Sequence, residues 1–183
     1  YGTRGMEPLR GFPEFMRAAA AAQQAFPHLQ VVVFGNDRAA YGYPSPHESG
    51  SWKQYMLDEL EGQLDLARLH FTGLLNYGEL VQLFRRSDLH CYFTRPYVVS
   101  WGVFQAAACG ARLLVNNFPG IDEVFASQFE AVVIDLEHEV LIDRAIIKLL
   151  KSGKKVQVRS NLAEGMELPA SIMKWLNLIS HQF

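Results

Sequence analysis

The stretch Val31-Val32-Val33-Phe34-Gly35-Asn36 (VVVFGN, residues 31–36) decides the fold class. An unbroken apolar run, mostly of β-branched residues, ends there at a glycine. Such a run is typical of a strand that is buried on both faces, and strands of that kind occur in parallel sheets covered by helices. The run therefore predicts a parallel strand in an α/β protein.

Outward from this run, strand patterns alternate with helical patterns. The other predicted strands are 69–71, 89–93, 113–115 and 131–134; the predicted helices are 12–26, one after Ser51, one near 77–84, one after Ser100, a short one from about Pro119, and 137–151. Such alternation indicates βαβ units. We expect a Rossmann-like three-layer α/β domain with a parallel sheet of about five to six strands. In the helix after Ser100, the spacing predicts an inner face of Trp101, Phe104 and Ala108.

Length and composition set the domain organisation. The chain has 183 residues, which suits one domain over 1–183 with residues 155–183 as a C-terminal helical tail. Basic and acidic residues number 17 and 19, so no broad basic field points to a nucleic-acid partner. No apolar run reaches about 18 residues, so we expect no membrane span and a cytoplasmic location. The first residue is Tyr1, not Met, so we expect an excised piece of a longer protein.

Cysteine and histidine usage argues against disulfide and zinc chemistry. The two cysteines, Cys91 and Cys109, stand in apolar surroundings and are expected to be buried free thiols. None of the histidines is spaced from another His or Cys as metal ligands are, so we expect no metal site. No phosphate-binding loop or nucleophile elbow is present either.

The predicted topology indicates where a ligand would bind. Open parallel sheets place ligands at the carboxyl ends of their strands, near the point where the strand order reverses. In this chain the loops at those ends begin near Gly35, Thr72, Thr94 and Asn116.

Two sets of residues near these loops suit an anion. Arg4 and Arg10 flank a glycine-bearing turn before the first helix, and guanidinium groups offer a fixed fork of donors to a diphosphate. The helix after Ser100 carries Gly102 in its first turn, where free N–H groups and the helix dipole attract negative charge. Taken singly, these features also fit solvated surface arginines and an ordinary packed helix.

The ordered segments of the chain resemble the donor-binding half of the GT-B glycosyltransferase family 4, also called group 1. The segments are TRGMEPLRGF, VVVFGND, LHFTGLL, SDLHCYFTRPYVVSWGVFQAAACG and NNFPGIDEV, from residue 3 to about 150. The resemblance implies one half of a GT-B fold that binds a nucleoside-diphosphate sugar. It also implies retaining, metal-independent glycosyl transfer to an acceptor on an absent N-terminal domain. The sugar nucleotide is then a substrate and no cofactor is expected; the isolated half is expected to be inactive.

The resemblance also implies roles for matching residues. Arg4 and Arg10 would stabilise the leaving diphosphate, together with the backbone of the helix start. Gly35 and Asn36 would lie at the phosphate edge, Gly73 and Leu74 would border the base, and Gln105 would face the ribose. The whole implied site is Arg4, Arg10, Gly35, Asn36, Gly73, Leu74, Tyr97, Ser100, Trp101, Gly102, Val103 and Gln105.

Two positions depart from the family pattern. Tyr97 and Gln105 stand where the family has a pair of glutamates, so neither position supplies a carboxylate. Neutral hydrogen bonds are weaker than charge-assisted ones, so weaker donor binding is expected. A catalytically degenerate GT-B-like binding or scaffold module is therefore an alternative. An epimerase-like α/β protein is a third possibility, although such enzymes need carboxylates and histidines in the cleft.

Overall fold

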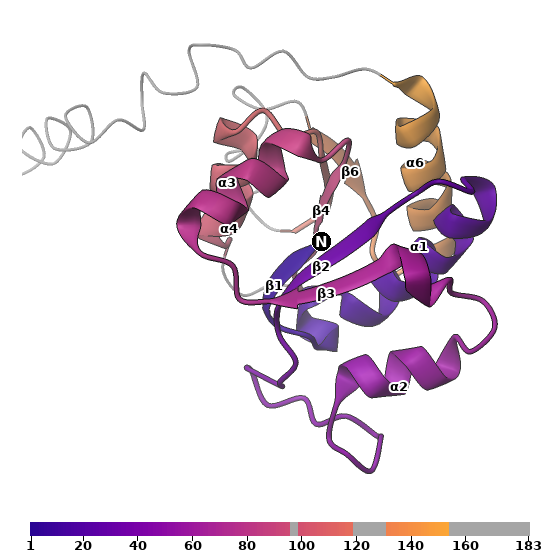
Figure 1. Cartoon of the computed structure of the whole chain (residues 1–183). Coiled ribbons are helices and arrows are strands. Elements are labelled where there is room, and N and C mark those ends of the chain that lie inside the picture. Colours follow the sequence, from indigo (N-terminus) through magenta and orange to yellow (C-terminus); the bar gives the residue numbers. More distant parts are fainter. Residues whose placement is uncertain (96–98, 119–130, 154–183) are drawn as a thin grey trace, which may run out of the picture.

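A computed structural model describes residues 1–95, 99–118 and 131–153 (Figure 1). The strands are β1 (Gly2–Gly5), β2 (Val31–Asn36), β3 (Leu69–Gly73), β4 (His90–Tyr92), β5 (Leu113–Asn116) and β6 (Ala131–Ile134). The helices are α1 (Phe12–Ala25), α2 (Trp52–Glu59), α3 (Tyr77–Arg86), α4 (Trp101–Ala108) and α6 (Glu139–Ser152), with 3₁₀ turns η1 (Pro8–Arg10) and η2 (Leu66–Arg68). The predicted helix from Pro119, the predicted tail 155–183 and Tyr97 lie outside the described residues.

The strands confirm the predicted parallel α/β class. All four described strand pairs are parallel, and they form two groups of three, β1-β2-β3 and β4-β5-β6. Strand β1 contacts β4, so the spatial order is β3-β2-β1-β4-β5-β6. The order reverses between β1 and β4, which is where sheets of this class bind ligands.

Helices cover both faces of the strands, which gives the three layers that the sequence predicts. Helices α1 and α6 contact each other on one side, and α3 and α4 contact each other on the other side (Figure 1). Neighbouring strand residues accordingly belong to different cores. Cys91 and Leu114 pack in the core that contains α1 and α6, whereas Tyr92 and Leu113 pack in the core beside α3 and α4.

Residues 2–5 form strand β1, although the sequence pattern predicts no strand there. Its residues GTRG have no apolar pattern, and the strand is held by main-chain pairing with β2. A Cβ atom on Gly2 would lie 1.8 Å from the Phe34 ring, and one on Gly35 would lie 1.8 Å from the carbonyl oxygen of Thr3. Gly35 also has a φ of 116°, a conformation that favours glycine. These glycines let β1 and β2 approach closely.

The helices predicted after Ser51 and Ser100 are confirmed, and each begins with a serine cap. Ser51 accepts a hydrogen bond from the backbone N–H of Gln54 and begins α2, and Ser100 accepts one from Gly102 and begins α4. Gly110 follows α4 with a φ of 79°, as expected of the residue that ends a helix.

The predicted inner face of α4 is wrong for Trp101 and Ala108, whereas Phe104 is half-buried and packs against the core as predicted. The helix buries Val103, Ala106 and Ala107, whereas Trp101 is 81% exposed and Ala108 is also exposed. The sequence of α4 is apolar nearly all the way round, so spacing alone does not single out one face. The choice is made by its partners in the core, which include Phe84, Tyr92 and Phe118.

Candidate functional site

Arg10 lies at the reversal of strand order and is the residue around which the candidate site is arranged. It ends the turn that follows β1, and its side chain is only 7% exposed. Its Nη1 donates to Oγ1 of Thr94 at 2.6 Å, across 84 residues of sequence. Its Nη2 donates to the hydroxyl of Tyr41 at 2.9 Å, with the guanidinium carbon 4.8 Å from the centre of the Tyr41 ring. The side chain is therefore held in one orientation by two other segments.

The main chain of Arg10 is also held. The hydroxyl of Tyr1 donates to the Arg10 carbonyl oxygen at 2.6 Å, and the Tyr1 ring stacks on Phe15 at 4.5 Å. Burial raises the pKa of the Tyr1 hydroxyl well above its ordinary value, so this group remains a donor. Both ends of Arg10 are thus anchored to the core.

Glu7 anchors the long loop that brings Tyr41 to Arg10. Its side chain is fully buried, and its Oε1 accepts hydrogen bonds from the backbone N–H groups of Ala40 at 3.0 Å and Tyr41 at 3.1 Å. Asn36 supports the same region, because its carbonyl oxygen accepts from the N–H groups of Met6 and Arg38. The predicted phosphate-edge residues therefore have structural roles: Gly35 lets β1 approach β2, and Asn36 bonds the chain at Met6 and Arg38.

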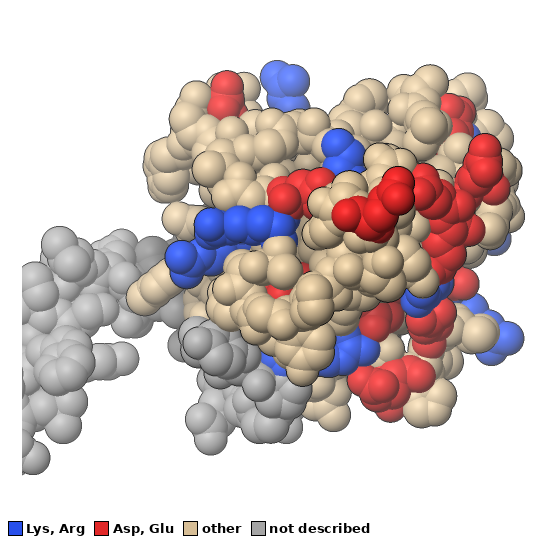
Figure 2. All heavy atoms as spheres, turned by 90° about the horizontal axis from the view of Figure 1, so that it is seen from below, with Lys and Arg blue, Asp and Glu red and all other residues tan. Residues whose placement is uncertain are grey.

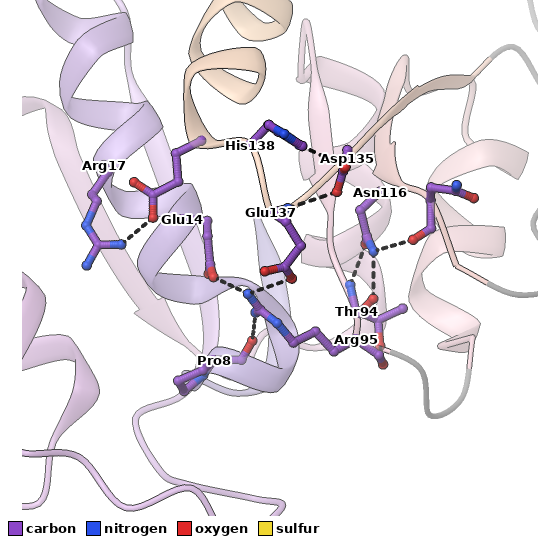
Figure 3. A network of polar contacts seen from close by, with 11 residues as sticks. Pro8, Glu14, Arg17, Thr94, Arg95, Asn116, Asp135, Glu137 and His138 are labelled. Carbon is purple, nitrogen blue, oxygen red and sulfur yellow. Dashed lines mark hydrogen bonds and ion pairs between the residues drawn. The ribbon is translucent and has the colours of Figure 1, made fainter.

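Asn116 fixes the carboxyl end of β4 to that of β5. Its Oδ1 accepts from the N–H of Thr94 at 2.7 Å, and its Nδ2 donates to the carbonyl oxygen of Thr94 at 2.8 Å (Figure 3). Asn116 is 3% exposed, and Thr94 is 1% exposed. This reciprocal pair holds the residue that receives the Arg10 side chain.

The first turn of α4 is tied to β4. The Tyr92 hydroxyl accepts a hydrogen bond from the N–H of Ser100 at 2.8 Å, and burial raises the pKa of this hydroxyl. Trp101 is exposed, Gly102 is partly exposed, and Val103 is fully buried in the core. Gly102 has no side chain and that of Val103 is buried, so these two residues can offer a ligand only their backbone. This turn carries the positive end of the helix dipole, while the N–H groups of Gly102 and Val103 already donate to the side-chain and carbonyl oxygens of Ser100.

The remaining predicted residues differ in accessibility. Arg4 is exposed in β1, unlike buried Arg10. Gly73 ends β3 with a φ of 69° and open space where a Cβ would stand, and Leu74 beside it is 73% exposed. Gln105 is half-buried on α4. The contacts described above bring Arg10 together with the ends of β1, β4 and β5; they do not include Arg4, Gly73 or Gln105.

The site residues predicted from the sequence do not include Glu7 or Tyr41, and the sequence indicates Thr94 and Asn116 only as the starts of loops at the ligand-binding edge. The signal for Thr94 and Asn116 was their position, because both residues follow predicted strands at the edge where ligands bind. Glu7 and Tyr41 gave no such signal, because their contact with Arg10 depends on how the loop after β2 folds back.

Charge on the lower face of the molecule is mixed. Figure 2 shows acidic side chains in a broad band over one side of this face, with basic side chains interspersed at its borders. Among residues 1–95, 99–118 and 131–153, no group of three His, Cys, Asp or Glu residues could hold a metal ion. Within the same part of the chain, no helix is long and apolar enough to cross a membrane.

Two cavities lie away from the candidate site. They have volumes of about 390 and 550 Å³, and both are lined by His28, Leu29 and residues 86–88 at the amino ends of the strands. Of the predicted site residues that the structure describes, which exclude Tyr97, none lines either cavity. The candidate site is thus an edge of the domain and is separate from both cavities.

Comparison with known proteins agrees with this architecture. The sequence of residues 10–157 matches a family described as glycosyl transferase-like. An uncharacterized glycosyltransferase of Methanocaldococcus jannaschii is 24% identical over 98 residues, which make up 53% of this chain and 25% of that protein. The match therefore spans only about a quarter of this curated relative.

Solved structures show the same fold. The C-terminal domain of a group 1 glycosyl transferase (LpcC) from Francisella tularensis has a TM-score of 0.70 at 15% identity, over 91% of this chain and 83% of that one. The pneumococcal O-GlcNAc transferase GtfA, solved with UDP and GlcNAc, has a TM-score of 0.70 at 13% identity, over 98% of this chain and 34% of that one. The fold is thus one Rossmann-like half of a GT-B glycosyltransferase, the half that forms the C-terminal domain of group 1 proteins. The chain belongs to the glycosyl transferase-like family.

Proposed function

We propose that this domain binds a nucleoside-diphosphate sugar at the carboxyl edge of its strands, as the donor half of a retaining, metal-independent glycosyltransferase. The acceptor would lie on an N-terminal domain of the longer protein. The observation that carries the proposal is Arg10, a buried guanidinium held in fixed orientation where the strand order reverses. Relatives of the same family and fold are glycosyltransferases, and one was solved with UDP.

The proposed chemistry is stabilisation of the leaving diphosphate. Negative charge grows on that group as the bond to the sugar breaks, and donors that are already oriented stabilise it without reorganisation. Arg10 and the first turn of α4 are both fixed to β4, through Thr94 and Tyr92. Exposed Arg4 would add a second cation. Gln105 would take the ribose, and Gly73 with Leu74 would border the base.

The test is nucleotide binding measured by calorimetry, with UDP, GDP and ADP as probes. We expect at least one of them to bind wild type. Arg10→Met should then weaken binding by about ten- to a hundredfold, since a hydrogen bond to a charged group contributes about 1.5–3 kcal/mol. Arg17→Met is the matched control, because Arg17 on α1 pairs with Glu59 on α2 and with Glu139 on α6 and has no bond to Arg10, Thr94 or Tyr41 among those described above. No binding of any probe, or equal affinities for both variants, would refute the proposal.

A binding or scaffold module is the second candidate, and Gln105 favours it because a neutral amide stands where the family has a carboxylate. The discriminating variant is Gln105→Glu. A gain in nucleotide affinity indicates an attenuated donor site. Absence of binding in both wild type and variant indicates that the fold serves another purpose.

A further inference from the structure

Arg95, the residue after Thr94, binds the turn that carries Arg10. Its backbone N–H donates to the carbonyl oxygen of Leu9 at 2.8 Å, and its Nη1 donates to that of Pro8 at 2.5 Å. Its Nη2 donates to Oε1 of Glu14 at 2.5 Å (Figure 3). One residue therefore holds both the main chain of the turn and the helix that follows it.

The charge of Arg95 is balanced where it lies. Its Nη2 pairs with Glu14 on α1 and, at 3.5 Å, with Oε1 of Glu137 after β6 (Figure 3). Two carboxylates face this guanidinium, so it is poorly suited to bind an anion itself. Its hydrogen bonds instead join the turn η1 to the start of α1, and its ion pair with Glu137 adds the loop after β6.

The packing beneath this turn leaves little freedom for adjustment. Gly11 ends η1 with a φ of 61°, and a Cβ on it would lie 2.6 Å from Cβ of Phe93. The turn is therefore pressed against the end of β4. Thr94 then holds the side chain of Arg10, and Arg95 holds the backbone that precedes it.

We propose that Arg95 is a positioning residue that fixes Arg10 for the diphosphate of the donor and does not touch the donor itself. The inference rests on the proposed function. Glu14 depends on Arg95 for its charge balance, because Glu14 is only 8% exposed and its Oε2 has no hydrogen-bond partner among the described residues. Without Arg95, that carboxylate would lose its cation and disturb the start of α1.

The experiment compares Arg95→Met with Arg17→Met. Both arginines bond two glutamates, and Arg17 lies on the same helix as Glu14. Nucleotide dissociation constants are measured by calorimetry at a temperature where every variant is folded, and thermal midpoints are recorded separately. We expect Arg95→Met to weaken binding about tenfold, the effect of losing about 1.4 kcal/mol, and Arg17→Met to leave it within about twofold. Arg95→Lys, which keeps one donor and the charge, should restore part of the loss.

A double-mutant cycle with Arg10→Met separates positioning from general structural damage. If Arg95 acts through Arg10, adding Arg95→Met to Arg10→Met changes affinity by less than about twofold, because interacting sites are not additive. Full additivity, or equal losses in Arg95→Met and Arg17→Met, overturns the inference while leaving the proposed function standing. Absence of nucleotide binding in wild type overturns the proposed function, and this inference with it.

Discussion

Replacement of Asn116 by alanine tests whether the edge that carries the candidate site depends on side-chain bonds. The amide of Asn116 accepts from the Thr94 N–H at 2.7 Å and donates to the Thr94 carbonyl at 2.8 Å. Both residues are nearly inaccessible, so Asn116→Ala leaves a buried backbone donor and a buried acceptor without their partner. Each such group costs about 1–3 kcal/mol, and we expect the free energy of unfolding to fall by about 2–5 kcal/mol.

The assay is urea unfolding followed by circular dichroism, with thermal unfolding as a second measurement. A loss of 3 kcal/mol corresponds to a midpoint about 6–12 °C lower for a chain of this size. Asn117→Ala is the matched control, because its side chain is exposed and the change should cost less than about 0.5 kcal/mol. Asn116→Asp keeps the acceptor for the N–H but sets a buried charge against the Thr94 carbonyl, so it should be at least as destabilising at pH 7. If Asn116→Ala is no worse than Asn117→Ala, the reasoning is refuted.

Two further predictions concern buried titratable groups. Burial holds the pKa of His90 well below its usual value, so the unfolded chain takes up a proton near pH 6.5 that the folded chain does not. Stability should fall below about pH 6.5 by about 1.4 kcal/mol per unit. His90→Phe, which keeps a ring stacked on Phe34 and edge-to-face with Phe84, should have a smaller slope between pH 7 and 5. Burial raises the pKa of Cys91 to about 12, so a thiol reagent at pH 8 should modify half-exposed Cys109 in the native protein and Cys91 only after unfolding. Equal pH slopes, or equal modification rates, would contradict these two predictions.

Strands with apolar side chains could be predicted from the sequence, and β1 could not. The apolar and mostly β-branched residues at 31–34 and the apolar residues at 113–115 predict buried strands, and both runs are strands in the structure. In β1 the stabilising contacts are main-chain bonds and a close approach at Gly2, neither of which leaves an apolar pattern. The prediction of the inner face of α4 failed for the opposite reason: nearly every position of α4 is apolar, so the pattern does not distinguish one face from another.

In the candidate site, too, features of a single segment could be predicted from the sequence, whereas contacts between distant segments could not. Arg10 could be singled out because a guanidinium after a glycine-rich turn suits an anion. Its partner Thr94 could not be paired with it, because that contact spans 84 residues and requires the order β2-β1-β4. That order depends on which strands become neighbours, and pattern analysis of separate segments does not provide it.

This strand order also explains why side chains gather at the candidate site. The strand pairing described for the chain falls into two groups of three, and the junction between them is where β1 meets β4. At the carboxyl end of this junction, the bonds from Arg10 to Thr94 and from Arg95 to Pro8, Leu9 and Glu14 cross from one group to the other. Three side-chain bonds and one main-chain bond thus supply the connections that a continuous ladder would supply elsewhere in a sheet. A diphosphate bound by Arg10 would therefore bind at the junction that its neighbours hold together, and the orientation of Arg10 would depend on how firmly the two groups are joined.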